Sequence, residues 1–273
     1  MYALEGFLAR LSGSEYADRL VLKGGVLMAA FDARRPTRDI DLAAQAVSGE
    51  VEDVLVLVRR IAATDLQDGL VFEPELAQAD SIRDEDQYRG VRVTLPCTLA
   101  SARIRFHVDV NVGDPIRPDP RSVGVPRLLG GVIEVRGYPL AMVYAEKIVT
   151  MAERGLANTR WRDFADVYLL SRTHDQDGAD LLAAISTVAG YRGAVVDRLA
   201  VILAGYPALA QPRWVAWRRR QLLEDRLPAD FAEVLQAVMV FADPCLMGGP
   251  APGTWDAAAG QWFGSRPPAP GDR

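Results

Sequence analysis

Two short motifs decide the fold class of this sequence: Lys23-Gly24-Gly25 and, after one short predicted helix, Thr37-Arg38-Asp39-Ile40-Asp41-Leu42. Side chains of an extended segment alternate between two faces, so Asp39 and Asp41 share one face. Ile40 and Leu42 share the opposite face, which we expect to be a core. Two convergent carboxylates repel each other unless a hard divalent cation such as Mg²⁺ lies between them. The pattern therefore predicts a metal site on a strand.

The glycine pair adds a second functional signal. Gly24 and Gly25 open a helix directly after a short strand over 20–22, and backbone N–H groups at a helix start suit phosphate. A phosphate-binding turn beside a two-carboxylate metal site indicates nucleotidyl transfer. The alternative is that Asp39 and Asp41 are surface residues of an edge strand, although aspartate is disfavoured in strands.

Composition limits the classes of protein to consider. The chain has 273 residues, 49% of them hydrophobic and 25% charged, which is ordinary for a soluble globular protein of one large or two modest domains. We find no apolar run long enough to span a membrane and no secretion signal, so no membrane partner is expected. Cys97 and Cys245 lack metal or redox spacing, which predicts a reducing cytoplasm. The net charge of −5 argues against non-specific coating of nucleic acid, but it leaves room for a local basic groove.

The pattern of apolar residues predicts an α+β protein with two parts. Strands are expected over 20–22, 39–43, 70–72, 88–95, 103–110 and 132–135, with a helix or two over 3–20, a short helix over 24–31 and an amphipathic helix after Ser48. The charged stretch 80–86 is interpreted as a solvated loop, and 113–126 as a connection. After Pro139 helices are expected near 140–154, 162–171, 179–189, 194–204, 213–224 and 229–241. We therefore predict a mixed α/β core over 1–138, an all-helical domain over 139–263 and a disordered tail over 264–273.

A third aspartate lies on the predicted strand whose polar and apolar residues alternate most regularly. From Arg103 to Val110 polar and apolar residues alternate strictly, so Asp109 belongs to the polar face and not to the core. A third carboxylate on a later strand is what phosphoryl chemistry with two metal ions requires. The alternative is an exposed aspartate that pairs with Arg103 or Arg105.

Lysine is rare here, which makes its two positions informative. Lys23 and Lys147 are the only lysines among 31 basic residues. Lys147 interrupts an apolar stripe of the helix after Pro139, and a buried ammonium is costly unless it meets an anion. A triphosphate is the anion we expect, and extension of the side chain to water is the alternative.

Two further aspartates follow in the next helix. Asp163 and Asp166 stand three residues apart and so share one helix face. Near a helix start they could simply complement the helix dipole. The functional interpretation is that one of them orients Lys147 or the acceptor hydroxyl.

In five elements that occur in order, the chain resembles the AbiEii family: Gly24-Gly25, Asp39-x-Asp41, Asp109, Lys147 and Arg160-x-x-Asp163-x-x-Asp166. The resemblance covers roughly residues 20–172. The family comprises nucleotidyltransferase toxins of type IV toxin–antitoxin systems and includes the mycobacterial MenT enzymes. It implies a DNA polymerase β-like core, a helical C-terminal domain, and transfer of nucleotides from NTPs, pyrimidines in some members, to tRNA 3′ ends. That transfer blocks tRNA charging and growth.

The resemblance also implies roles for individual residues. Asp39, Asp41 and Asp109 would bind Mg²⁺ or Mn²⁺, and Gly24, Gly25 and Thr37 would lie against the nucleotide. Lys147 would hold the triphosphate, and Asp163, in preference to Asp166, would complete the catalytic set. Lys23, Arg38 and Asp166 are further candidates for the site. An antitoxin encoded by an adjacent gene is the implied protein partner.

An RNA acceptor requires a basic surface. Arg34, Arg35 and Arg38 flank the aspartate pair, and Arg218 and Arg219 belong to a segment, 213–220, that mixes arginine with Trp214 and Trp217. The alternative for that segment is a helix that buries its tryptophans under a solvated arginine face. Other candidate functions are nucleotidyl transfer to an antibiotic-like small molecule or to a protein. A catalytically silent module that binds RNA or a partner is the candidate from another class.

Overall fold

The computed structural model describes residues 1–34, 37–83 and 89–264. It divides into two compact units, one formed by Met1–Pro115 with Asp119–Pro139 and the other by Ile116–Pro118 with Leu140–Arg273. The α+β fold class is confirmed. In the described part of the chain, no helix combines the length and apolar character needed to cross a membrane.

The first unit is built on an eight-stranded mixed sheet in the order β3-β5-β6-β2-β1-β8-β7, with β4 also paired to β5. Its strands are β1 Leu20–Lys23, β2 Asp39–Ala44, β3 Leu70–Phe72, β4 Gln78–Arg83, β5 Arg89–Leu99, β6 Ala102–Val112, β7 Arg121–Pro126 and β8 Val132–Gly137. The pairs β1–β8 and β2–β6 are parallel, and the remaining pairs are antiparallel.

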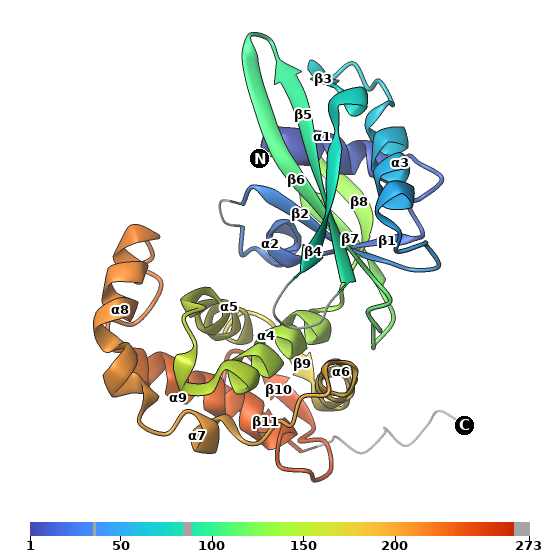
Figure 1. Cartoon of the computed structure of the whole chain (residues 1–273). Coiled ribbons are helices and arrows are strands. Elements are labelled where there is room, and N and C mark those ends of the chain that lie inside the picture. Colours follow the sequence, from blue (N-terminus) through green and yellow to red (C-terminus); the bar gives the residue numbers. More distant parts are fainter. Residues whose placement is uncertain (35–36, 84–88, 265–273) are drawn as a thin grey trace, which may run out of the picture. The chain divides into compact units, whose positions relative to one another are not determined.

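The strict alternation along β6 divides the sheet into an apolar and a polar face. Phe106, Val108 and Val110 are buried. Helices α1 (Tyr2–Ser12) and α3 (Val51–Ala62) pack on the sheet (Figure 1), and the Phe7 ring of α1 lies edge-on to Phe106 at 6.2 Å. Because the intervening side chains of β6 point the other way, the polar residues of this strand gather on the opposite face.

Several elements of the first unit differ from the sequence prediction. The stretch 80–86 was predicted to be a loop, but Gln78–Arg83 forms β4 and pairs with β5; residues 84–88 lie outside the described ranges. The predicted connection 113–126 contains the strand β7. The sequence also predicts Ser48 as the cap of the helix that follows it, but the N-cap of α3 is Glu50, and the Ser48 hydroxyl accepts a hydrogen bond from the Glu50 N–H at 3.2 Å.

The second unit is mainly helical. Its helices are α4 Leu140–Arg154, α5 Trp161–Ser171, α6 Gly178–Arg192, α7 Leu199–Ile202, α8 Tyr206–Arg220 and α9 Phe231–Ala242. A small antiparallel sheet of β9 Gln176–Asp177, β10 Thr254–Asp256 and β11 Gln261–Phe263 was not predicted. Residues 265–273 of the predicted disordered tail lie outside the described residues.

Aromatic side chains hold the helices of the second unit together. Phe231 of α9 contacts Trp161 and Phe164 of α5, with ring centroids at 5.8 and 5.3 Å. Both α5 residues also contact Tyr206 at the start of α8. The pairing of α4 with α5 sets Lys147 beside the aspartates of α5, which are predicted site residues.

Candidate active site

The sheet register brings charged residues of four strands into one row. Asp41 of β2 lies beside Asp109 of β6, Asp109 lies beside Arg92 of β5, and Arg92 lies beside Asp80 of β4. With Ser81, Ile82 and Asn111 these four residues line a cavity of about 390 Å³. The predicted convergence of Asp41 and Asp109 on one face follows from this register. We call this cavity the carboxylate cavity.

The glycine turn fits tightly against Asp41. Gly24 has φ +65°, a left-handed conformation that favours glycine, and a Cβ added to it would lie 1.9 Å from the Asp41 Oδ2 atom. The N–H of Gly25 donates to the same oxygen at 3.4 Å. A Cβ on Gly25 would meet the Thr37 hydroxyl oxygen at 2.9 Å. The turn therefore brings both glycines and Thr37 next to the aspartate strand, and the Gly25 N–H is a hydrogen-bond donor to Asp41.

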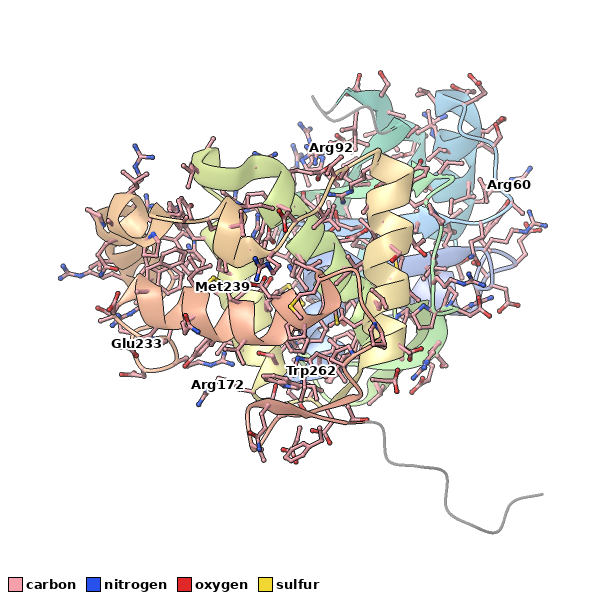
Figure 2. All side chains as sticks on the ribbon, turned by 90° about the horizontal axis from the view of Figure 1, so that it is seen from below. Arg60, Arg92, Arg172, Glu233, Met239 and Trp262 are labelled. Atoms are coloured by element: carbon pink, nitrogen blue, oxygen red, sulfur yellow. The ribbon has the colours of Figure 1, made fainter. Side chains whose placement is uncertain are left out.

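Arg92 forms a bidentate ion pair with Asp109. Its Nε and Nη2 atoms lie 2.8 and 2.6 Å from the two carboxylate oxygens, and Asp109 is only 7% exposed. The hydrogen bonds that Arg92 donates to Asp109 raise the pKa of Arg92 above its usual value, although burial opposes the shift, and the charges of Asp109, Asp39 and Asp41 raise it further. The guanidinium, labelled in Figure 2, thus lies in the field of all three predicted metal ligands.

Sequence reasoning did not identify Arg92. The available signal was its place between Val91 and Val93, which assigns it to the polar face of its strand. The pairing with Asp109 was not available, because it depends on the register of β5 against β6.

The donor set suits a hard divalent cation only in part. Asp39 and Asp41 supply carboxylate oxygens from one face of one strand, which is the chemistry that Mg²⁺ and Mn²⁺ prefer. Among the residues described, however, no three His, Cys, Asp or Glu side chains are grouped to hold an ion. Asp109 is engaged by Arg92, so it could bind a metal only by exchanging the guanidinium for the ion.

Lys23 forms an ion pair within the first unit. Its Nζ lies 2.8 Å from Asp114 and 5.6 Å from the centre of the Tyr138 ring. Both ion-pair partners are largely buried, with 11% and 13% of their side chains exposed. This pairing accounts for Lys23 without assigning it to a nucleotide.

In the second unit Lys147 meets the two aspartates of α5. Its Nζ donates to Asp166 at 2.7 Å and to Asp163 at 3.2 Å, and Arg160 Nε donates to Asp163 at 2.7 Å. An ammonium has three N–H groups, so these two bonds leave one for another acceptor. Burial by itself raises the pKa of Asp163, but the charges of Lys147 and Arg160 outweigh it and lower that pKa. Asp163 is therefore a buried anion between two cations.

The predicted RNA-contacting arginines have different surroundings. Arg34 donates to Glu5 at 2.8 Å and to the Pro126 carbonyl, so it contributes to the packing of the first unit. Arg38 is exposed, and Arg35 lies outside the described residues. Arg218 donates to the Glu224 carbonyl at 3.4 Å.

Of the two tryptophans of 213–220, Trp214 belongs to the core of the second unit and Trp217 is half-buried. Trp214 is fully buried and stacks on Trp217 at 5.4 Å, so it is not available to a base. The alternative interpretation of this segment is therefore correct for Trp214. Arg219 lines a groove of about 540 Å³ together with Arg213 and Arg220. These three arginines form no ion pair with any carboxylate of the described residues.

The family to which this chain belongs makes it a nucleotidyltransferase. The family model for the nucleotidyl transferase AbiEii toxin of type IV toxin–antitoxin systems matches residues 6–259, and the chain belongs to that family. This confirms the resemblance found in the sequence. Membership implies an NTP as substrate and an antitoxin as partner.

One solved structure shares the fold at low sequence identity. JHP933 from Helicobacter pylori has a TM-score of 0.52 and 11% identity, covering 89% of this chain and 90% of its own. A second H. pylori chain, described as a candidate nucleotidyltransferase, has a TM-score of 0.49 and 12% identity, covering 89% and 92%. No curated protein matches the sequence.

Proposed function

We propose that this toxin transfers NMP from an NTP, a pyrimidine nucleotide by resemblance to its family, to the 3′ end of tRNA in the cytoplasm. The bond that forms joins the 3′-oxygen of the acceptor to the α-phosphorus, and the bond that breaks releases pyrophosphate. Mg²⁺ or Mn²⁺, held by Asp39 and Asp41, would neutralise the triphosphate and activate the hydroxyl when bound. The fit of Gly24 against Asp41 is the single observation that carries this assignment.

The chain's own residues supply positioning and charge. Asp39 and Asp41 are the acceptors for the hydroxyl proton, and the Gly24-Gly25 turn fixes the Asp41 carboxylate. Lys147 would bind the triphosphate through the N–H that Asp163 and Asp166 do not use, while those two aspartates orient its ammonium. Asp109 would join the metal ligands once Arg92 releases it.

RNA binding in the second unit would use the groove of Arg213, Arg219 and Arg220. Three neighbouring guanidinium groups that lack a carboxylate partner among the described residues repel one another, and a phosphodiester backbone relieves that repulsion. A local cationic groove on a chain of net charge −5 is what an RNA acceptor requires.

Incorporation of radiolabelled NMP into total tRNA tests the proposal. Wild-type protein should label tRNA in the presence of Mg²⁺, and Asp41→Ala should abolish the label. Asp53→Ala, which removes an exposed carboxylate of α3, should label like wild type. Full activity of Asp41→Ala would refute the site assignment. Label found only in a protein or a small molecule would show that the acceptor is that molecule and not tRNA.

A further inference from the structure

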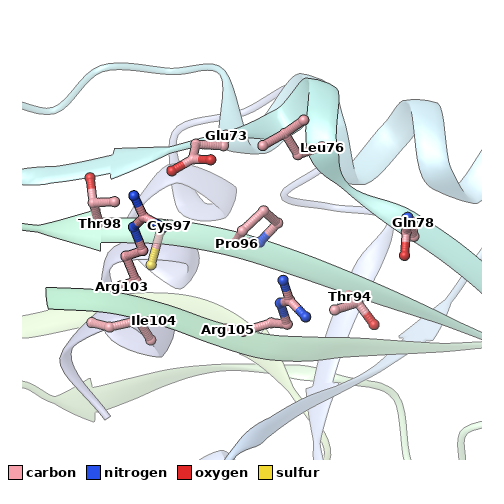
Figure 3. Close-up of a pocket in the computed structure, with 10 residues that line it drawn as sticks. All are labelled: Glu73, Leu76, Gln78, Thr94, Pro96, Cys97, Thr98, Arg103, Ile104 and Arg105. Atoms are coloured by element: carbon pink, nitrogen blue, oxygen red, sulfur yellow. The ribbon is translucent and has the colours of Figure 1, made fainter.

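We infer that the single-stranded end of the RNA acceptor lies along the polar face of β5 and β6 and ends beside Asp109. The relevant surface is a groove of about 860 Å³, the β5–β6 groove, whose polar lining includes Gln78, Thr94, Thr98, Arg103 and Arg105 (Figure 3). The inference rests on the proposed transfer to RNA and specifies where the acceptor backbone binds.

The first argument is the chemistry of the lining. Arg103 and Arg105 are exposed, and neither forms a hydrogen bond or an ion pair with another described side chain. Thr94, Thr98 and Gln78 add neutral hydrogen-bonding groups, and Glu73 is the one carboxylate among the described residues of the lining. Arginine recognises phosphate and neutral polar groups recognise ribose, so the set suits a nucleic acid backbone.

The second argument is continuity with the carboxylate cavity. Arg103, Arg105, His107 and Asp109 occupy alternate positions of β6 and therefore share a face. His107 lies between the arginines and Asp109 in this row. Its Nδ1 is 3.1 Å from the hydroxyl of Thr94, which lines the groove, and His107 pairs with Asp39 in the sheet register. Arg103 and Asp109 are about 20 Å apart along the strand. A strand of RNA laid on the arginines thus leads to the predicted metal ligands.

The third argument concerns the kind of partner. The centres of protein–protein interfaces are enriched in aromatic side chains, and the described residues that line the β5–β6 groove include none. Because the described residues of this lining offer no aromatic ring to a base, we place the main contacts on the sugar–phosphate backbone. Binding here should therefore depend strongly on salt and weakly on base sequence.

The test measures the affinity of a fluorescein-labelled single-stranded RNA for the full chain at 50 to 200 mM salt by fluorescence anisotropy. The variant is Arg103→Gln combined with Arg105→Gln. The control is Arg60→Gln combined with Arg172→Gln, two exposed arginines outside the groove that are labelled in Figure 2. Loss of two phosphate contacts on a single strand lowers the salt slope by about 1.4, so wild type should lose about sevenfold more affinity over this range than the variant.

The outcomes separate this inference from the proposed function. A lower salt slope in the groove variant alone, with an unchanged unfolding midpoint, supports the β5–β6 groove even if no NTP labels RNA, in which case only the proposed transfer fails. Wild-type affinity and slope in the groove variant would overturn the groove while leaving transfer to RNA intact.

Discussion

Replacing Gly24 by alanine tests the link between the glycine turn and Asp41. The new Cβ would lie 1.9 Å from Asp41 Oδ2, whereas real Cβ contacts are not found below 3.0 Å, so the carboxylate must move by about 1 Å. A misplacement of that size in a catalytic group costs about a hundredfold in rate. The left-handed φ of +65° adds a cost to stability of about 1–2 kcal/mol. We therefore expect Gly24→Ala to fold and to lose about a hundredfold in nucleotidyl transfer.

Gly193→Ala is the matched control. Gly193 has φ +60°, close to that of Gly24, but a Cβ there has no neighbour within 4 Å. Both variants pay the same conformational cost, which corresponds to a melting temperature lower by about 2–8 °C. Only Gly24→Ala should lose transfer, measured as labelled NMP incorporated into total tRNA under steady-state conditions. Equal activity of the two variants would refute the claim that the turn positions Asp41.

Further predictions concern the ion pairs. Arg92→Gln leaves Asp109 without its cation, and because Arg92 is itself 44% exposed we expect a modest loss of stability, about 1–2 kcal/mol, that millimolar Mg²⁺ reduces in thermal unfolding. The same loss with and without Mg²⁺ would contradict an exchange of Arg92 for metal. The lowered pKa of Asp163 stabilises the fold above the usual carboxyl pKa of about 4, and this contribution is lost as pH falls through the lowered value. Urea unfolding should therefore show Asp163→Asn less stable than wild type at neutral pH, with the difference shrinking below about pH 4; a constant difference would be inconsistent with an ionised Asp163.

The local periodicity of apolar residues was sufficient to predict those helices and strands that bury one regular face. Alternation over 103–110 predicted most of β6, and the apolar stripe after Pro139 predicted α4. Strand β4 was missed because an edge strand exposed on one side can carry charges such as Asp80 without losing its pairing. The helix expected over 194–204 is reduced to Leu199–Ile202, after α6 ends at the left-handed Gly193.

The candidate site was predictable where residues are close in sequence. Spacing alone placed Asp39 and Asp41 on one face and Asp163 and Asp166 on another. Partners remote in sequence were not predictable, because they depend on register and packing. Arg92 reaches Asp109 across a hairpin. The turn also revealed a use of Gly24 that sequence did not suggest, namely close approach to a carboxylate.

The central claim is that the aspartates of β2 direct transfer of a nucleotide to an RNA 3′-hydroxyl. The most direct measurement compares label from each NTP on untreated tRNA and on tRNA whose terminal ribose has been oxidised with periodate, with wild type and Asp41→Ala in parallel. We predict label only where wild-type protein meets an intact 3′ end. Label on oxidised tRNA, or on tRNA treated with Asp41→Ala, would contradict the account.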